Sequence, residues 1–120
     1  MKTYMLQTED GAKSLGGMSL GAGITYFSVG PMHSYLKDQK AVSYSSATDQ
    51  EMLDAYKMIA QTEGICSALE PMAGAAEIIF RQAKDKPKDY IICLSLCGRG
   101  EKDLDTIQEQ IGKDFEWKIR

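Results

Sequence analysis

The sequence predicts an α/β fold, a small parallel sheet flanked by helices. Three observations point to this class. The run Tyr90–Leu96 is apolar nearly throughout, as expected for a strand that is covered on both faces. Apolar residues recur at helical spacing after Thr48 and again after Pro71. Helical and strand patterns that alternate along one short chain are typical of α/β domains.

The first 45 residues contain two candidate strands and one short helix. Residues 1–7 are a short apolar segment, and Ala41–Ser45 alternates in polarity as a strand does. Between them, residues 11–30 form a glycine-rich irregular loop, because each glycine inside a helix costs about 1 kcal/mol relative to alanine. Pro31 suits the first position of a short helix.

Three further helices are expected in the rest of the chain. Thr48 and Glu51 form a capping box that begins the first of them, and Gly64 ends it. The predicted inner stripes are Met52, Leu53, Tyr56, Ile59 and Ala60, then Met72, Ala75, Ala76, Ile79, Phe80 and Ala83, then Leu104, Ile107 and Ile111. We expect one domain over residues 1–112 and a tail over residues 113–120 that adds an edge strand or hangs free.

Composition excludes several classes of function. The 120 residues are 43% hydrophobic and 26% charged, which is ordinary for a soluble domain. A net charge of -3 without a basic block argues against a nucleic-acid surface. No apolar run has the length of a membrane span, and the first residues lack a signal peptide's apolar core, so we expect a cytoplasmic protein without membrane contact.

The three cysteines and one histidine do not form a zinc pattern, so no metal site is expected from side chains. Cys93 lies within the apolar run and is expected to be a core residue. The turn Gly98-Arg99-Gly100 precedes a helix, where free backbone N–H groups can bind an anion; a plain turn explains it equally well. Glu70 precedes Pro71 and has an ordinary explanation as a carboxylate near a helix start.

Six segments carry a resemblance to a known family. They are Leu6–Gly11, Gly21–Ile24, Val29–Asp38, Glu63–Ile65, Ala68–Glu70 and Leu96–Asp103. Together, in order and at close to the same spacing, they resemble the β subunit of tryptophan synthase. The resemblance runs from about Lys2 to about Gly112 and covers only the C-terminal part of that subunit. It implies part of the large domain of the pyridoxal-phosphate (PLP) enzymes of fold type II.

The resemblance also implies roles for individual residues. Glu70 matches the family's catalytic glutamate, which faces the cofactor ring, and therefore has a second reading as a remnant of acid–base catalysis. Cys97, followed by Gly98, takes the place of a serine that hydrogen-bonds the pyridine nitrogen. Ile24, Tyr26 and Ser28 match a loop that offers backbone carbonyls to a monovalent cation. Thr25 stands where the family has an aspartate that takes part in active-site closure.

The family joins an aminoacrylate derived from L-serine to indole with the help of PLP. Its Schiff-base lysine and its glycine-rich phosphate loop lie upstream of the segments matched here. The resemblance therefore implies a truncated domain that is inactive and binds no cofactor alone, with a homo-oligomer or a missing upstream chain as its partner. Two alternatives stay open: one half of a split enzyme, or a small anion-, ligand- or partner-binding module that reuses the scaffold.

Overall fold

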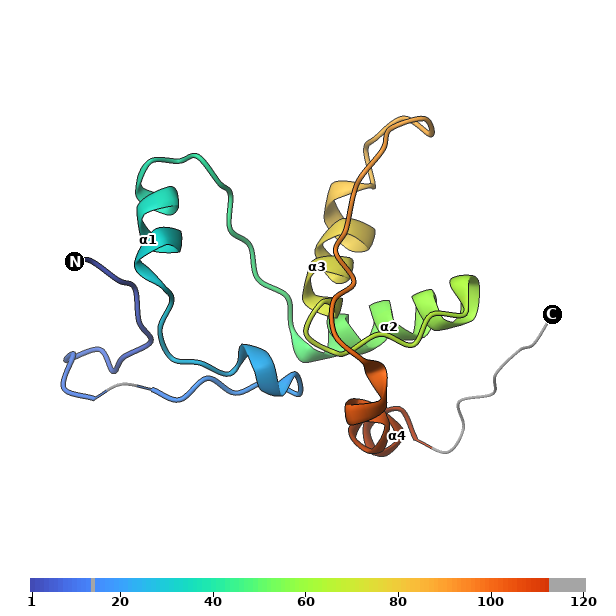
Figure 1. Ribbon diagram of the computed structural model, residues 1–120, viewed down its shortest axis with the longest axis horizontal. Coiled ribbons are helices and arrows are strands. Elements are labelled where there is room, and N and C mark those ends of the chain that lie inside the picture. Colours follow the sequence, from blue (N-terminus) through green and yellow to red (C-terminus); the bar gives the residue numbers. More distant parts are fainter. Residues whose placement is uncertain (14, 113–120) are drawn as a thin grey trace. The chain divides into compact units, whose positions relative to one another are not determined.

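The chain divides into two compact units, because residues contact one another mainly within each unit. They are Met1–Ser45 and Ser46–Arg120, here called the N-terminal and C-terminal units. The structure is a computed structural model that describes residues 1–13 and 15–112, and Figure 1 shows its helices. Each unit is described by itself. The predicted tail over residues 113–120 lies outside the described residues.

The N-terminal unit contains one α-helix, α1 (Pro31–Asp38), which begins at the predicted proline. Ser34 is buried on this helix and ties it to the start of the chain. Its hydroxyl accepts a hydrogen bond from the Tyr4 amide at 3.2 Å and donates one to the Gly30 carbonyl at 3.4 Å. A small polar side chain therefore holds the first residues against the helix.

In residues 11–13 and 15–30 the glycine-rich loop is irregular, as predicted, apart from one turn of 3-10 helix, η1 (Ala22–Ile24). Gly17 lies so close to the backbone of Thr25 that a Cβ atom there would be 2.5 Å from its carbonyl oxygen. Glycine at this position is thus required by a close approach of two backbone segments. The expected strand over residues 1–7 is reduced to isolated bridging, with Met5 paired antiparallel to Ser28.

The C-terminal unit begins with its longest helix, α2 (Asp49–Glu63), where the capping prediction is confirmed. The Thr48 hydroxyl accepts a hydrogen bond from the Glu51 amide at 3.2 Å, and the Glu51 carboxylate accepts one from the Thr48 amide at 2.8 Å. Gly64 ends the helix in the left-handed conformation. The helix buries Met52, Leu53, Ala55, Tyr56 and Ala60, while the predicted Ile59 is half-buried.

Removing the cap of α2 gives a direct test of this local structure. We expect Thr48→Ala to lower the free energy of unfolding by about 1 kcal/mol, because the Glu51 amide loses its hydrogen-bond acceptor at the helix start. Urea denaturation followed by circular dichroism measures the change. Thr62→Ala is the matched control, since the exposed Thr62 hydroxyl donates only to the Met58 carbonyl within the helix. An equal loss in both variants would contradict the role of the cap.

The next helix, α3 (Met72–Glu77), continues into a π-helical turn, η2 (Ile78–Gln82). Its first turns supply much of the core, because Met72, Ala75 and Ala76 are fully buried. Farther along the predicted stripe burial declines: Ile79 and Phe80 are half-buried and Ala83 is exposed. Arg81 ties this end to α2 through an ion pair with Glu51 at 2.5 Å.

The turn after residue 97 opens a helical segment, as predicted. A 3-10 turn, η3 (Gly100–Asp103), leads directly into α4 (Leu104–Ile111). Ile107 is buried and Ile111 is half-buried, but Leu104 is 48% exposed, so its place in the inner stripe was predicted wrongly. The core-facing residue at this junction is instead Asp103, which is 6% exposed.

The predicted parallel sheet is not formed among the described residues. Neither Ala41–Ser45 nor Tyr90–Leu96 forms a strand, although Figure 1 shows the latter running alongside α3. Cys93 is exposed and is therefore not a core residue, and Ile91 is 84% exposed. A strand needs neighbours that bond its backbone and cover its side chains, and within residues 46–112 no strand adjoins this run.

Candidate functional site

Two segments of the C-terminal unit pack closely and bring predicted site residues together. The segment 66–70 precedes α3, and the segment 97–103 precedes α4. Their closest approach is at Gly100, where a Cβ atom would overlap the Cys66 carbonyl oxygen. Beside it, a Cβ atom on Gly98 would lie 2.9 Å from the Ala68 side chain. Both glycines are therefore required by packing, and Gly98 also has a φ of 78° that favours glycine.

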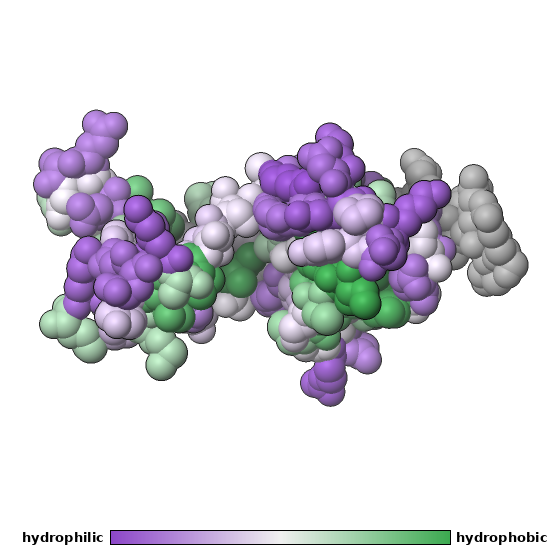
Figure 2. Space-filling view, turned by 90° about the horizontal axis from the view of Figure 1, so that it is seen from above, coloured by the Kyte–Doolittle hydropathy of each residue, from purple (hydrophilic) through white to green (hydrophobic). Residues whose placement is uncertain are grey.

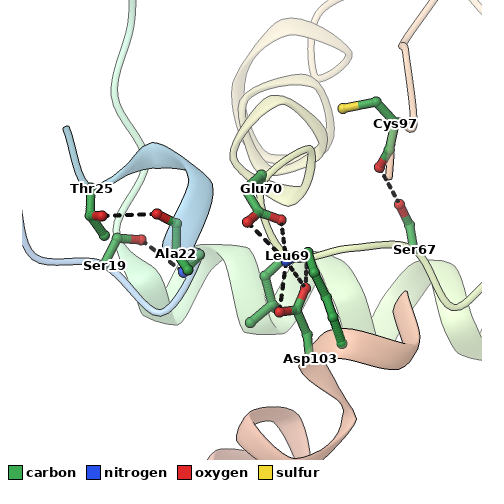
Figure 3. Close-up of polar contacts among 10 residues, drawn as sticks. Ser19, Ala22, Thr25, Ser67, Leu69, Glu70, Cys97 and Asp103 are labelled. Atoms are coloured by element: carbon green, nitrogen blue, oxygen red, sulfur yellow. Dashed lines mark hydrogen bonds and ion pairs between the residues drawn. The ribbon is translucent and has the colours of Figure 1, made fainter. Parts of the chain in front are cut away.

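Cys97 and Glu70 lie on these two neighbouring segments, as Figure 3 shows. The Cys97 carbonyl accepts a hydrogen bond from the buried Ser67 hydroxyl at 3.5 Å. The Cys97 residue itself is exposed, as is Arg99 in the turn that follows. The structure thus places Glu70 and Cys97 on two neighbouring segments, next to the Gly98-Arg99-Gly100 turn that was a candidate for anion binding.

Glu70 belongs to a cluster of three charged side chains, together with Lys102 and Asp103. The Lys102 ammonium lies 2.9 and 2.8 Å from the two Glu70 oxygens and 2.8 Å from both Asp103 oxygens. Asp103 Oδ2 also accepts a hydrogen bond from the Leu69 amide at 2.9 Å. In Figure 3 the carboxylates of Glu70 and Asp103 face each other across these contacts. Glu70 is therefore held by a specific ion pair from the other segment, in addition to its place before a helix.

The charges of this cluster raise the pKa of Lys102 above its ordinary value of 10.5. The hydrogen bond to Asp103 is the largest cause, and the bond to Glu70 is the second. Both carboxylates stabilise the protonated ammonium. Lys102 consequently stays an ammonium at neutral pH and is a poor amine nucleophile.

This shift predicts how stability changes at alkaline pH. A pKa that is higher in the folded than in the unfolded state stabilises the fold below the unfolded value, and the contribution is lost as pH rises through the folded value. We therefore expect the unfolding midpoint in urea to fall as pH rises above 10.5. Lys102→Met should remove that part of the pH dependence, whereas Lys57→Met on α2 should retain it. If the urea midpoint of the Lys102→Met variant fell with pH in parallel with that of the unchanged chain, Lys102 would not be the source of this pH dependence.

A buried phenol interacts electrostatically with Asp103 of the charged cluster. Tyr56 on α2 is 2% exposed, and burial is the main reason that its pKa is raised. Its hydrogen bond with Cys66 and the nearby Asp103 carboxylate raise the pKa further. The phenol is therefore neutral at physiological pH.

The predicted cation loop lies in the N-terminal unit. Ile24 ends η1, Tyr26 is 77% exposed, and Ser28 pairs with Met5. The Thr25 hydroxyl donates to the Ala22 carbonyl at 2.8 Å and so closes the η1 turn. In residues 1–13 and 15–112 there is no group of three or more histidine, cysteine or acidic side chains that could hold a metal. Cation binding by the carbonyls of this loop stays a prediction.

Sequence reasoning assigned no role to Lys102 and Asp103, although both belong to a segment that carries the resemblance. The signal was present: Lys102 and Asp103, which carry opposite charges, follow Glu101 just after the glycine turn, and Glu70 ends the other apolar segment. What the sequence did not show is that the two segments lie side by side, with Asp103 turned inward.

Comparison with known proteins identifies relatives over nearly the whole chain. The tryptophan synthase beta chain of Dinoroseobacter shibae is 44% identical over 118 residues, which is 98% of this chain and 28% of the relative. Those of Ruegeria pomeroyi and of a Bradyrhizobium species are 43% and 42% identical over 95% and 93% of this chain. No family model matches the chain. The chain thus spans little more than a quarter of the length of these relatives.

No helix among the described residues is both long enough and apolar enough to cross a bilayer.

Proposed function

Because this chain belongs with the tryptophan synthase beta chains over the segment that it shares with them, we propose that it forms one wall of a PLP active site. In this proposal Glu70 faces the cofactor ring, and Cys97 and Gly98 lie at the pyridine nitrogen. The observation that carries the proposal is the close packing of segments 66–70 and 97–103, which holds these residues on one edge.

The residues present fit one side of such a cofactor. Glu70 offers an oriented carboxylate, and Cys97 offers a thiol, a weaker hydrogen-bonding group than the family's serine. PLP, when bound, acts as an electron sink for chemistry at the amino-acid substrate. In this chain Glu70 would hold or move a proton beside the ring. Lys102 would keep Glu70 oriented, and as a doubly paired ammonium it is unsuited to holding the cofactor covalently.

We propose that catalysis requires further polypeptide that supplies the Schiff-base lysine and the phosphate loop. Large apolar side chains of the C-terminal unit support this, since Tyr90, Ile91 and Ile92 remain exposed on the unpaired run. Figure 2 shows apolar residues at the surface between hydrophilic ones. Exposed apolar surface of this kind is typical of an interaction site. The proposed occupant is the remainder of the beta-chain fold, as a covalent or separate partner.

Fragment complementation tests this function. The chain would be co-expressed with the remainder of the Ruegeria pomeroyi beta chain, cut at the start of the matched segment, in bacteria that lack their own beta chain. We expect growth without tryptophan, and indole consumption with L-serine, only when both pieces are present. The relative's own two pieces, cut at the same place, are the positive control. Activity of that control pair without activity of the mixed pair would refute the proposal.

A matched pair of substitutions then tests Glu70 itself. Glu70→Gln should abolish complementation, because the carboxamide keeps the shape but cannot exchange a proton. Glu101→Gln makes the same chemical change on an exposed neighbour in η3 and should leave complementation unchanged. Equal activity of both variants would remove Glu70 from the reaction.

The alternative of a free-standing binding module has a separate test. Thermal shift of the chain alone with phosphate, PLP, L-serine and indole would reveal it as a specific stabilisation by one of them. The packing roles of Gly98 and Gly100 account for both glycines without an anion, so we expect no shift with phosphate.

A further inference from the structure

The inward-facing carboxylate of Asp103 contacts both the Leu69 backbone amide and the Lys102 side chain. Its side chain is 8% exposed, whereas Lys102 is 47% exposed. A carboxylate this buried requires partners that satisfy it. Asp103 has two: the Leu69 amide and the Lys102 ammonium, at 2.9 and 2.8 Å.

Both partners are connected to Glu70, one through the backbone and the other through an ion pair. Leu69 is its neighbour in the chain, so the bond from the Leu69 amide fixes the backbone one residue before Glu70. Lys102 binds both Glu70 oxygens, so its position fixes the carboxylate itself. Asp103 thus restrains Glu70 at two points, the peptide that precedes it and the group that would act.

The position of Asp103 is in turn rigid. It lies at the end of η3, and the start of η3 at Gly100 packs against the Cys66 carbonyl. Ile107, one turn later on α4, is buried. The carboxylate therefore projects from a segment anchored on both sides, which is what a residue needs in order to position another.

We propose that Asp103 is a positioning residue that orients Glu70 through the Leu69 amide and the Lys102 ammonium. This inference rests on the proposed function for the role of Glu70, while the restraint itself is a property of this chain alone. Lys102 serves as the link: shared between two carboxylates, it has its position set by the more buried one.

Nuclear magnetic resonance of the 120-residue chain tests the restraint without any cofactor. In Asp103→Ala we expect amide hydrogen exchange at Leu69 to become at least 10-fold faster, and the Overhauser contact between Glu70 and Lys102 side chains to be lost. The Met52 amide, which donates to the Thr48 carbonyl at the start of α2, reports whether the unit remains folded. Asp105→Ala, an exposed aspartate two residues later, should change neither signal.

Asp103→Asn distinguishes the contribution of the Leu69 amide from that of the Lys102 ammonium. It also tests whether Asp103 restrains Glu70 if the alanine variant unfolds. Its carboxamide oxygen can still accept from the Leu69 amide, so exchange there should stay within about 3-fold of the unchanged chain. The charge that holds Lys102 is lost, so the Glu70–Lys102 contact should weaken by at least half. An undiminished contact in Asp103→Asn, or unchanged Leu69 exchange in a folded Asp103→Ala, would overturn the inference.

Enzyme kinetics of the complementing pair of fragments test the effect of Asp103 on catalysis. Asp103→Asn should lower kcat about 10-fold while leaving KM for L-serine within 2-fold, because the substrate is bound by other residues and only the orientation of Glu70 changes. A rise in KM with unchanged kcat would overturn the inference. If the unchanged pair shows no activity, the proposed function fails, and the resonance measurements still decide whether Asp103 restrains Glu70.

Discussion

Gly100→Ala is expected to destabilise the C-terminal unit by about 3 kcal/mol, the upper end of the usual cost of overpacking. The added methyl group would overlap the Cys66 carbonyl oxygen and lie 2.9 Å from the Ser67 carbonyl oxygen. Both obstacles are backbone atoms, which cannot rotate away as the end of a flexible side chain can. The two segments that carry Glu70 and Asp103 would have to separate, so local structure at the site should be lost together with stability.

Urea denaturation of the purified chain measures this loss, and Gly64→Ala supplies the graded control. Gly64 has a φ of 68° and open space around its Cα, so alanine there meets only the cost of the left-handed conformation, about 1 kcal/mol. Equal losses in the two variants would show that conformation, and not the approach of residues 66–67, explains the glycine at position 100.

Helices of this chain are predictable from sequence because their signals are local. The capping box at Thr48, the proline at the start of α1 and the glycine after α2 each act within one turn, and each is confirmed. The burial of Met72, Ala75 and Ala76 follows from helical spacing alone.

The sheet was not predictable in the same way, because a strand depends on partners elsewhere. The apolar run Tyr90–Leu96 was expected to be covered on both faces, yet Ile91 is 84% exposed in the described structure. Its apolar composition is typical of a strand covered on both faces, and the chain spans little more than a quarter of the length of its relatives. The apolar composition of a segment therefore indicates that it is suited to burial. Whether it is buried depends on the neighbouring elements that cover it.

The candidate site was predictable only in part. The resemblance identified Glu70 and Cys97, and the structure places them on adjoining segments. The burial of Asp103 was missed, because helical spacing favoured the apolar Leu104 as the inward residue. The 3-10 turn before α4 explains the error: it changes the angle per residue, so the inward face shifts by one position.

Leu69→Ala is expected to have a comparably large effect, a loss of about 3 kcal/mol in the free energy of unfolding. The Leu69 side chain is 0% exposed, so its removal takes apolar area from the core and leaves a cavity. The substitution keeps the amide that donates to Asp103. Stability and the restraint on Glu70 should therefore separate: the folded fraction shrinks, but the Glu70–Lys102 contact should persist in the molecules that remain folded.

Leu104→Ala is the matched control, because it removes the same atoms from a side chain that is 48% exposed. Surface substitutions of this kind usually change stability by less than about 0.5 kcal/mol. Thermal or urea unfolding of the two variants, side by side, measures the difference. A loss in Leu104→Ala as large as that in Leu69→Ala would mean that the inward face of α4 lies where helical spacing had predicted it. Asp103 would then no longer be the buried group on which the restraint of Glu70 depends.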